Sequence, residues 1–133
     1  MCDAPEHEAM EIRSKIWLEV NGEPVFSRGR AVLLRAIDRY GSINRAAAET
    51  GISYRRAWGY IKAMEKRLGM DLVRTKTGGV GGGGTMLTDE ARCFLLMYEE
   101  LESGINELVD ERFRNIFRNS GAAGFGRRYA KLS

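Results

Sequence analysis

The stretch that decides the fold is residues 42–68, SINRAAAETGISYRRAWGYIKAMEKRL. Ser42 is a favourable N-cap for a short helix that continues to Thr50. A second N-cap, Ser53, begins a longer helix that runs to about Leu68. Gly51 stands in the tight turn between them, where positive φ is needed. Two helices joined in this way predict a helix-turn-helix.

The two helices of this motif have distinct faces. Ala46 and Ala47 point inward and are small enough to let the helices cross closely. On the second helix, helical spacing places four apolar residues on the buried face: Ala57, Ile61, Met64 and Leu68. The opposite face then carries polar residues and one glycine: Arg55, Gly59, Lys62 and Lys66, with Tyr54 and Arg56 beside them. In proteins of this plan the second helix enters the major groove of DNA.

The residue types on the outer face suit contacts with duplex DNA. Arg55 and Arg56 can pair with guanine, whereas Lys62 and Lys66 are typical phosphate ligands. We therefore predict a DNA-binding set formed by Asn44, Arg45, Ser53, Tyr54, Arg55, Arg56, Gly59, Lys62, Lys66, Arg74 and Lys76. The alternative is that the arginines simply solvate an exposed helix. Trp58 borders the buried face and is predicted to be a wedge between helices rather than a base-stacking residue.

Before this motif, the pattern predicts a β-hairpin and a helix. Residues 14–20 alternate between apolar and polar side chains, as a half-buried strand does. Asn21-Gly22 is a two-residue hairpin signal, and residues 24–26 form the returning strand. From Arg30 the period becomes helical, with one expected apolar stripe: Val32, Leu33, Ala36, Ile37 and Tyr40.

After the motif, residues 72–74 and 85–87 are short and strand-like, and residues 78–84 between them are almost entirely glycine. Two short strands around such a tip predict a β-wing. A phosphate-binding loop of the Walker type would need a Gly-Lys-Ser/Thr run leading into a helix, and none is present. A nucleotide-binding enzyme is therefore the weaker interpretation.

Thr88 is expected to cap a long helix over residues 89–117. Its apolar residues recur with heptad spacing at Phe94, Tyr98, Leu101, Ile105 and Leu108. This seam predicts a homodimer, since paired DNA-reading domains match a two-fold operator. The alternative is that the helix folds back onto the strand pair of its own chain.

Charge is distributed unevenly along the 133 residues, whose formal net charge is only +3. Residues 28–76 carry twelve basic and four acidic residues, and the segments on either side, 1–27 and 77–117, are net acidic. A compact basic segment is typical of a polyanion-binding surface.

The composition excludes several classes of protein. His7 is the one histidine, so an enzyme that depends on histidine chemistry is not predicted. Cys2 and Cys93 have no metal-binding spacing and are expected to be free thiols in the cytoplasm. No secretory signal or membrane-spanning segment is expected.

Three runs, residues 41–47, 51–58 and 77–88, together resemble the N-terminal DNA-binding domain of the ModE family of molybdate-dependent transcriptional regulators. The similarity covers roughly residues 15–117. LysR-type regulators are similar only through the helix-turn-helix. The ModE resemblance implies a winged helix-turn-helix dimer that binds operators of molybdenum-uptake or molybdoenzyme genes.

Full-length ModE regulators add C-terminal molybdate-binding modules, whereas this chain has only a short basic tail after the long helix. We therefore expect no cofactor in this chain, and molybdate sensing, if used, through a separate effector-sensing protein.

The predicted organisation is a mainly α fold with a small β content. A disordered acidic tail (1–13) precedes a winged helix-turn-helix domain (14–88), a dimerisation helix (89–117) and a flexible basic tail (118–133). The predicted function is sequence-specific binding of double-stranded DNA as a homodimer. The alternative is a protein-interaction module whose working surface is the long helix.

Overall fold

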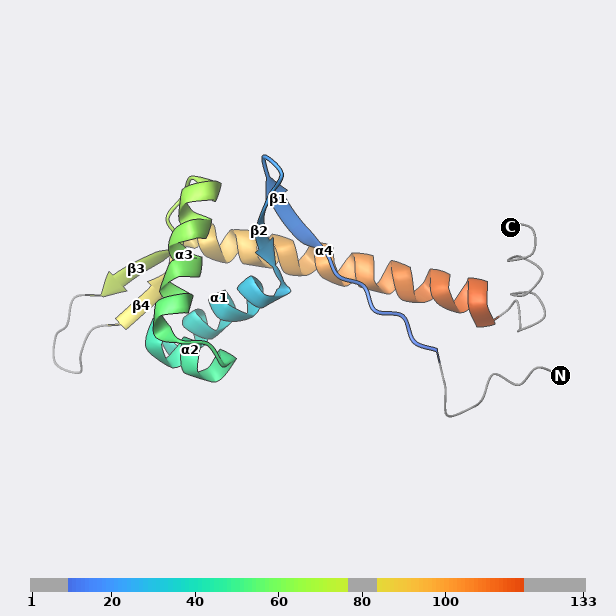
Figure 1. Cartoon of the computed structure of the whole chain (residues 1–133), viewed down its shortest axis with the longest axis horizontal. Coiled ribbons are helices and arrows are strands. Elements are labelled where there is room, and N and C mark those ends of the chain that lie inside the picture. Colours follow the sequence, from blue (N-terminus) through green and yellow to red (C-terminus); the bar gives the residue numbers. More distant parts are fainter. Residues whose placement is uncertain (1–9, 77–83, 119–133) are drawn as a thin grey trace. The chain divides into compact units, whose positions relative to one another are not determined.

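The computed structural model describes residues 10–76 and 84–118. In chain order the elements are β1 (Trp17–Val20), β2 (Glu23–Ser27), α1 (Arg28–Tyr40), α2 (Ile43–Thr50), α3 (Tyr54–Leu68), β3 (Val73–Lys76), β4 (Gly84–Leu87) and α4 (Asp89–Phe113), followed by a π-helical stretch, Arg114–Arg118 (Figure 1). The predictions made for residues 1–9, 77–83 and 119–133 lie outside the described residues. None of the described helices combines the length and the apolar character that a membrane span needs.

The chain divides into two compact units, one formed by residues 16–101 and the other by residues 1–15 and 102–133. The first unit contains the β-hairpin, the three short helices, the wing and the first half of α4, and it therefore extends past the predicted boundary at residue 88. In the second unit, the Ser14 hydroxyl donates a hydrogen bond to Asn106 Oδ1 at 2.6 Å. The mainly α fold with a winged helix-turn-helix is confirmed.

The N-terminal hairpin forms as its turn signal predicts. Strands β1 and β2 pair antiparallel, and Asn21 and Gly22 both adopt positive φ, at 53° and 80°. This is the backbone that a two-residue turn needs to match the strand twist. The strand begins at Trp17, three residues later than predicted, although the alternation of half-buried and exposed side chains starts at Ser14.

Phe26 on β2 joins the hairpin to α4. Its ring meets Phe94 and Tyr98 edge-on, with 4.9 Å between centroids in both pairs, an arrangement that aromatic rings favour. The Tyr98 hydroxyl donates to the Ile16 carbonyl at 3.1 Å, so the one polar atom of this buried side chain is satisfied. Tyr98 is only 2% exposed. The prediction that Tyr98 belongs to a dimer seam is therefore wrong. Phe94, the other predicted seam residue that contacts Phe26, is partly buried against the core of its own chain.

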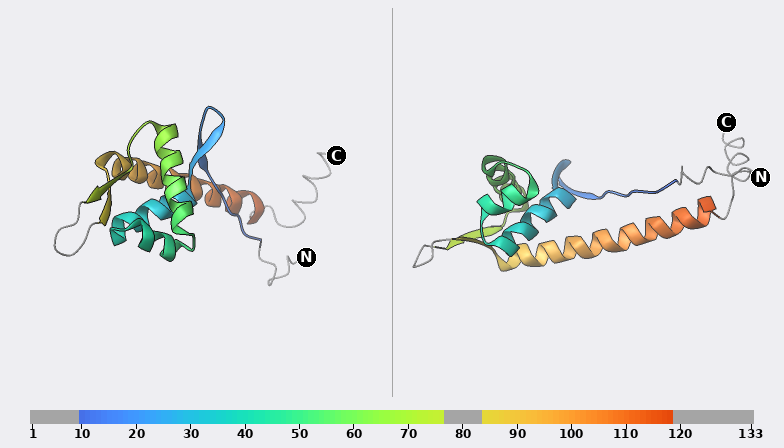
Figure 2. Two further views of the ribbon diagram at one scale, coloured as in Figure 1. Left: turned by 60° about the vertical axis from the view of Figure 1, so that its left-hand side comes forward. Right: turned by 90° about the horizontal axis from the view of Figure 1, so that it is seen from below.

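Helix α1 lies alongside the first half of α4 (Figure 2). Arg35 pairs with Glu99, and Arg92 donates to Asp38 at 3.1 Å, so ion pairs link the two helices. The predicted stripe of α1 needs one correction, because Val32 is 50% exposed. The buried face is centred on Leu34 and Ile37, and Val32 precedes Leu34 by two residues, which turns it about 160° away.

The wing consists of β3 and β4, which pair antiparallel with Val73 opposite Leu87. It is fastened to the turn that ends α1, because the Thr85 N–H donates to the Gly41 carbonyl at 2.8 Å. Gly84 comes so close to this turn that a Cβ on it would lie 2.7 Å from the Gly41 oxygen. Thr88 then caps α4 by accepting from the Ala91 N–H, as predicted. The α-helix ends at Phe113 rather than Phe117.

We predict that Gly84→Ala destabilises the domain by roughly 1–3 kcal/mol, because its Cβ would meet backbone that cannot move aside. The matched control is Gly59→Ala in the exposed middle of α3, where no atom lies within 4 Å of the added Cβ. That variant should gain roughly 0.5–1 kcal/mol, since glycine is costly inside a helix. Urea unfolding followed by circular dichroism measures both. Equal effects in the two variants would contradict the proposed fastening of the wing.

Candidate nucleic-acid interface

The helix-turn-helix is built on small side chains between α2 and α3. Ala46, Ala47 and Ala57 are at most 1% exposed. In the turn between the two helices, Gly51 has a φ of 77°, and the Ile52 N–H donates to the Ala47 carbonyl at 3.0 Å. These contacts confirm the predicted motif and hold one face of α3 against the domain.

Both predicted N-caps are present. Ser42 Oγ accepts from the Arg45 N–H, and Ser53 Oγ accepts from the Arg56 N–H, each at 3.1 Å. The C-terminal end of α3 is also fixed, since the Arg67 side chain donates to the Pro24 carbonyl at 2.7 Å. The helix is thus capped at its N-terminus and held against the domain at its C-terminal end and along its inner face.

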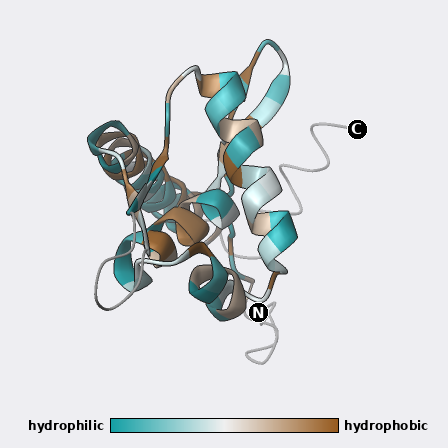
Figure 3. Ribbon diagram, turned by 90° about the vertical axis from the view of Figure 1, so that its left-hand side faces the viewer, coloured by the Kyte–Doolittle hydropathy of each residue, from teal (hydrophilic) through white to brown (hydrophobic). Residues whose placement is uncertain are grey.

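The outer face of α3 is polar and exposed, as the periodicity predicts. Hydrophobic residues gather where the helices face one another, and hydrophilic ones lie on their outer sides (Figure 3). The buried residues of α3 are Ala57, Ile61 and Met64. Arg55, Gly59, Lys62 and Lys66 are all exposed. Within the described ranges, Arg55 and Lys66 have no ion-pair or hydrogen-bond partner for their side chains, so both cations are available to an anion.

Arg56 lies on a different side of α3 from Arg55, since neighbouring helical residues are about 100° apart. Its guanidinium donates to the Tyr60 hydroxyl at 3.0 Å. The Arg30 guanidinium stacks over the same ring, 3.5 Å from its centroid. Arg56 is therefore exposed but oriented by Tyr60, and it does not share one ridge with Arg55 and Lys62.

Trp58 contradicts its prediction as a wedge between helices. The side chain is 42% exposed, and the Lys62 ammonium lies 4.3 Å from the centre of its ring. The core below is filled instead by Ala57 and Ile61, which are fully buried. Periodicity alone does not separate an indole at the border of a helix face from one inside the core, because Trp suits both places.

The remaining predicted DNA-binding residues are exposed at three places in the fold. Asn44 and Arg45 lie in the first turn of α2, where the Arg45 guanidinium is 4.9 Å from the Tyr40 ring. Ser53 and Tyr54 begin α3. Arg74 and Lys76 lie on β3 of the wing. Their contacts with DNA stay predictions.

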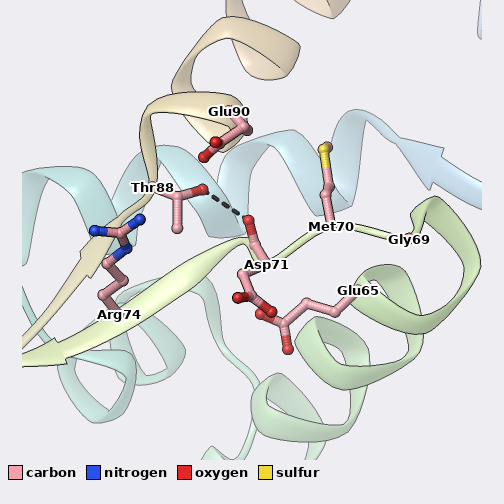
Figure 4. Close-up of a pocket in the computed structure, with 7 residues that line it drawn as sticks. All are labelled: Glu65, Gly69, Met70, Asp71, Arg74, Thr88 and Glu90. Atoms are coloured by element: carbon pink, nitrogen blue, oxygen red, sulfur yellow. Dashed lines mark hydrogen bonds between the residues drawn. The ribbon is translucent and has the colours of Figure 1, made fainter.

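A cleft of about 410 Å³ lies where the C-terminal end of α3 meets the wing and α4. Its lining residues, drawn in Figure 4, are Glu65, Gly69, Met70, Asp71, Arg74, Thr88 and Glu90. The Thr88 hydroxyl donates to the Asp71 carbonyl at 2.7 Å, and Glu65 Oε2 accepts from the Leu72 N–H at 2.8 Å. These two side chains hold the junction together. In the part of the chain that the structure describes, no cluster of side chains suited to a metal ion occurs.

Glu65 connects this junction to the outer face of α3. Its Oε1 accepts from the Lys62 ammonium at 3.0 Å. Partial burial by itself raises the pKa of the Glu65 carboxyl. The hydrogen bond from the Leu72 N–H and the charge and hydrogen bond of Lys62 outweigh it, so the pKa lies below its ordinary value of 4.5.

Comparison with known proteins identifies the domain. Residues 29–92 match the family of bacterial regulatory helix-turn-helix proteins of the lysR type. The chain is 38% identical to the molybdenum transport protein ModE of Azotobacter vinelandii over 102 residues, which are 77% of this chain and 38% of that protein. It is 40% identical to the molybdenum-pterin-binding protein MopB of Rhodobacter capsulatus over 60% of this chain and 30% of that one.

The chain is also 40% identical to the DNA-binding transcriptional dual regulator ModE of Escherichia coli K12, over 54% of this chain and 28% of that protein. It therefore spans roughly a third of the length of these relatives. Among solved structures, the BenM_DBD/benA site 1 DNA complex aligns with a TM-score of 0.49 and 22% identity, covering 65% of this chain and 91% of that one.

We predict that Glu65→Gln lowers stability by roughly 1 kcal/mol at pH 7, because an amide accepts the Leu72 hydrogen bond less strongly and does not pair with Lys62. The pKa of Glu65 is lower in the folded state than in the unfolded state, where it is about 4.5, so ionised Glu65 stabilises the native state at pH values above the unfolded-state pKa. That stabilisation is lost as the pH falls through the folded-state pKa. The difference between variant and wild type should therefore disappear in acid. Glu107→Gln on exposed α4 is the control, and a Glu65→Gln deficit that persists at low pH would contradict the prediction.

Proposed function

Because the chain carries a helix-turn-helix DNA-binding domain of the ModE family, we propose that it is a cytoplasmic, non-enzymatic transcriptional regulator that binds a two-fold operator as a homodimer. Its target genes are those for molybdenum uptake or molybdoenzymes, in line with its similarity to the molybdenum transport protein ModE of Azotobacter vinelandii.

The observation that carries this proposal is the outer face of α3. Arg55 and Lys66 are exposed cations without partners in the described residues, on a helix whose other face is buried by Ala57, Ile61 and Met64. The N-terminal end of α3, where Arg55 lies, also carries the positive end of the helix dipole. A rigid helix with such a face fits the width of the major groove, where arginine discriminates guanine and lysine neutralises phosphates.

The wing supplies a second contact region. Arg74 and Lys76 project from β3, and the Thr85–Gly41 hydrogen bond keeps this ribbon against the end of α1. Asn44 and Arg45 occupy the first turn of α2. Together these residues add positive or hydrogen-bonding groups from two further elements, suited to contacts with the phosphate backbone.

The dimer contact proposed here uses α4, on a face shifted from the predicted seam. Tyr98 is buried in its own chain, whereas Met97, Leu101 and Leu108 are 62%, 46% and 52% exposed. With Gly104 these residues recur at intervals of four, three and four, which is a heptad pattern. Leu101 and Leu108 belong both to the predicted seam and to this exposed stripe. Ile105, also in the predicted seam, lies beside the stripe and is half-buried. A second copy of the helix covers such a stripe most simply.

Arg55→Ala is expected to weaken binding to the preferred operator by about 1–3 kcal/mol and to flatten the sequence preference at one base pair. Lys66→Ala should weaken binding to all sequences about equally and lower the number of counterions released on binding by about one, which reduces the salt dependence of the affinity. Lys66 is the cleaner phosphate variant, since Lys62 is engaged with Glu65. Selection from a random duplex library, followed by titrations at several salt concentrations, measures both. Equal losses on every sequence for Arg55→Ala would contradict groove reading by this residue.

Leu101→Glu should convert the dimer into monomers at micromolar concentration and reduce affinity for a two-fold operator by roughly tenfold or more, because the half-sites then bind separately. Leu96→Glu is the matched control, as Leu96 is also exposed on α4 but lies outside the heptad stripe. Sedimentation equilibrium reports the mass. A Leu101→Glu variant that remains dimeric would contradict the proposed interface, and a wild-type chain that binds no operator would favour a protein-interaction module.

A further inference from the structure

Trp58 is a large aromatic side chain that the core of the domain does not use. It lies in the second turn of α3 and is 42% exposed, while its neighbours Ala57 and Ile61 fill the space beneath the helix. Single exposed aromatic residues are normal on protein surfaces, so a role for Trp58 rests on its contacts and its place on α3.

The indole is held in place by a chain of contacts. The Leu72 N–H donates to Glu65 at 2.8 Å, Glu65 accepts from Lys62 at 3.0 Å, and the Lys62 ammonium lies 4.3 Å from the centre of the Trp58 ring. An ammonium over an indole is attracted by the ring's negative face. Because Glu65 is itself tied to the backbone, this chain restricts the motion of Lys62 and of the ring beneath it. A pre-ordered side chain loses less entropy when it binds a partner.

Trp58 also lies beside the residues proposed to face the groove. By helical geometry it is about 60° around α3 from Arg55 and about 40° from Lys62. The next residue, Gly59, has no side chain and nothing within 4 Å of where its Cβ would be. Base edges can therefore come close to the helix at Gly59. Gly59 is about 100° around α3 from Trp58, with Arg55 and Lys62 between them, so the indole lies at the edge of the face that meets the groove.

We propose that Trp58 recognises thymine, by packing the apolar surface of its indole against the C5-methyl group of that base in the major groove. This inference rests on the proposed binding of duplex DNA by α3. The thymine methyl is the one apolar group that the base pairs present in the major groove. An apolar side chain that is already ordered matches it, whereas the neighbouring Arg55 and Lys62 match acceptors and phosphates.

The test removes the methyl group and the indole separately. A duplex operator selected by the wild-type chain is resynthesised with each thymine in turn replaced by deoxyuridine, which keeps the base pair and lacks only the methyl. The wild type should bind at least one of these duplexes about fourfold more weakly, as expected for one buried methyl-sized group. In Trp58→Ala the same replacement should change affinity by less than twofold, which gives a double-mutant cycle.

Two further variants make the result specific. Trp17→Ala removes another exposed indole, which is 51% exposed on β1, and should keep the full deoxyuridine effect. Trp58→Phe retains an apolar ring and should keep part of it. The inference is overturned if no deoxyuridine position weakens the wild type, or if Trp58→Ala shows the same fourfold effect. Either of these results leaves DNA reading by α3 intact, whereas failure to select any operator would remove the proposed function itself.

Discussion

The close packing of α2 on α3 is the constraint on which the rest of the domain depends. Ala46, Ala47 and Ala57 are almost completely buried, and side chains of this size let the two backbones approach. Once the inner face of α3 packs against α2, helical geometry determines which of its residues face outward. The exposed position of Arg55, Gly59 and Lys66 is thus a consequence of core packing. A larger residue at Ala47 would disturb the site without touching it.

Hydrogen bonds tie the wing to the end of α1 and tie α3 to the segment that leads into the wing. The Gly41 carbonyl that follows α1 receives the Thr85 N–H, and Gly84 must lack a side chain for this approach. Glu65 ties α3 to the backbone that leads into β3. Hydrogen bonds within one compact unit therefore fix the positions of both α3 and the wing. Such pre-organisation reduces the entropy lost when both surfaces bind the same partner.

Most of the fold was predictable because its signals are local. Caps such as Ser42 and Ser53, the Asn21-Gly22 turn and the helical period of α3 act within a few residues. The missed features arise from tertiary contacts and from side-chain rotamers. The heptad spacing of α4 does not reveal that Phe26 takes Tyr98 into the core and leaves an adjacent stripe exposed. The Gly84–Gly41 approach joins residues far apart in the sequence, which no local pattern indicates. The contacts of Arg56 with Tyr60 and of Lys62 with Trp58 have i,i+4 spacing, but this spacing alone does not determine the side-chain rotamers that make them.

The measurement that tests the central claim most directly is a titration of the isotope-labelled chain with its selected duplex, followed by amide chemical shifts. If the outer face of α3 lies in the major groove, the largest changes occur around Arg55 and Gly59, with a second group on the wing at Arg74 and Lys76. Changes confined to the β1–β2 hairpin or to α4, with α3 unaffected, would contradict the account.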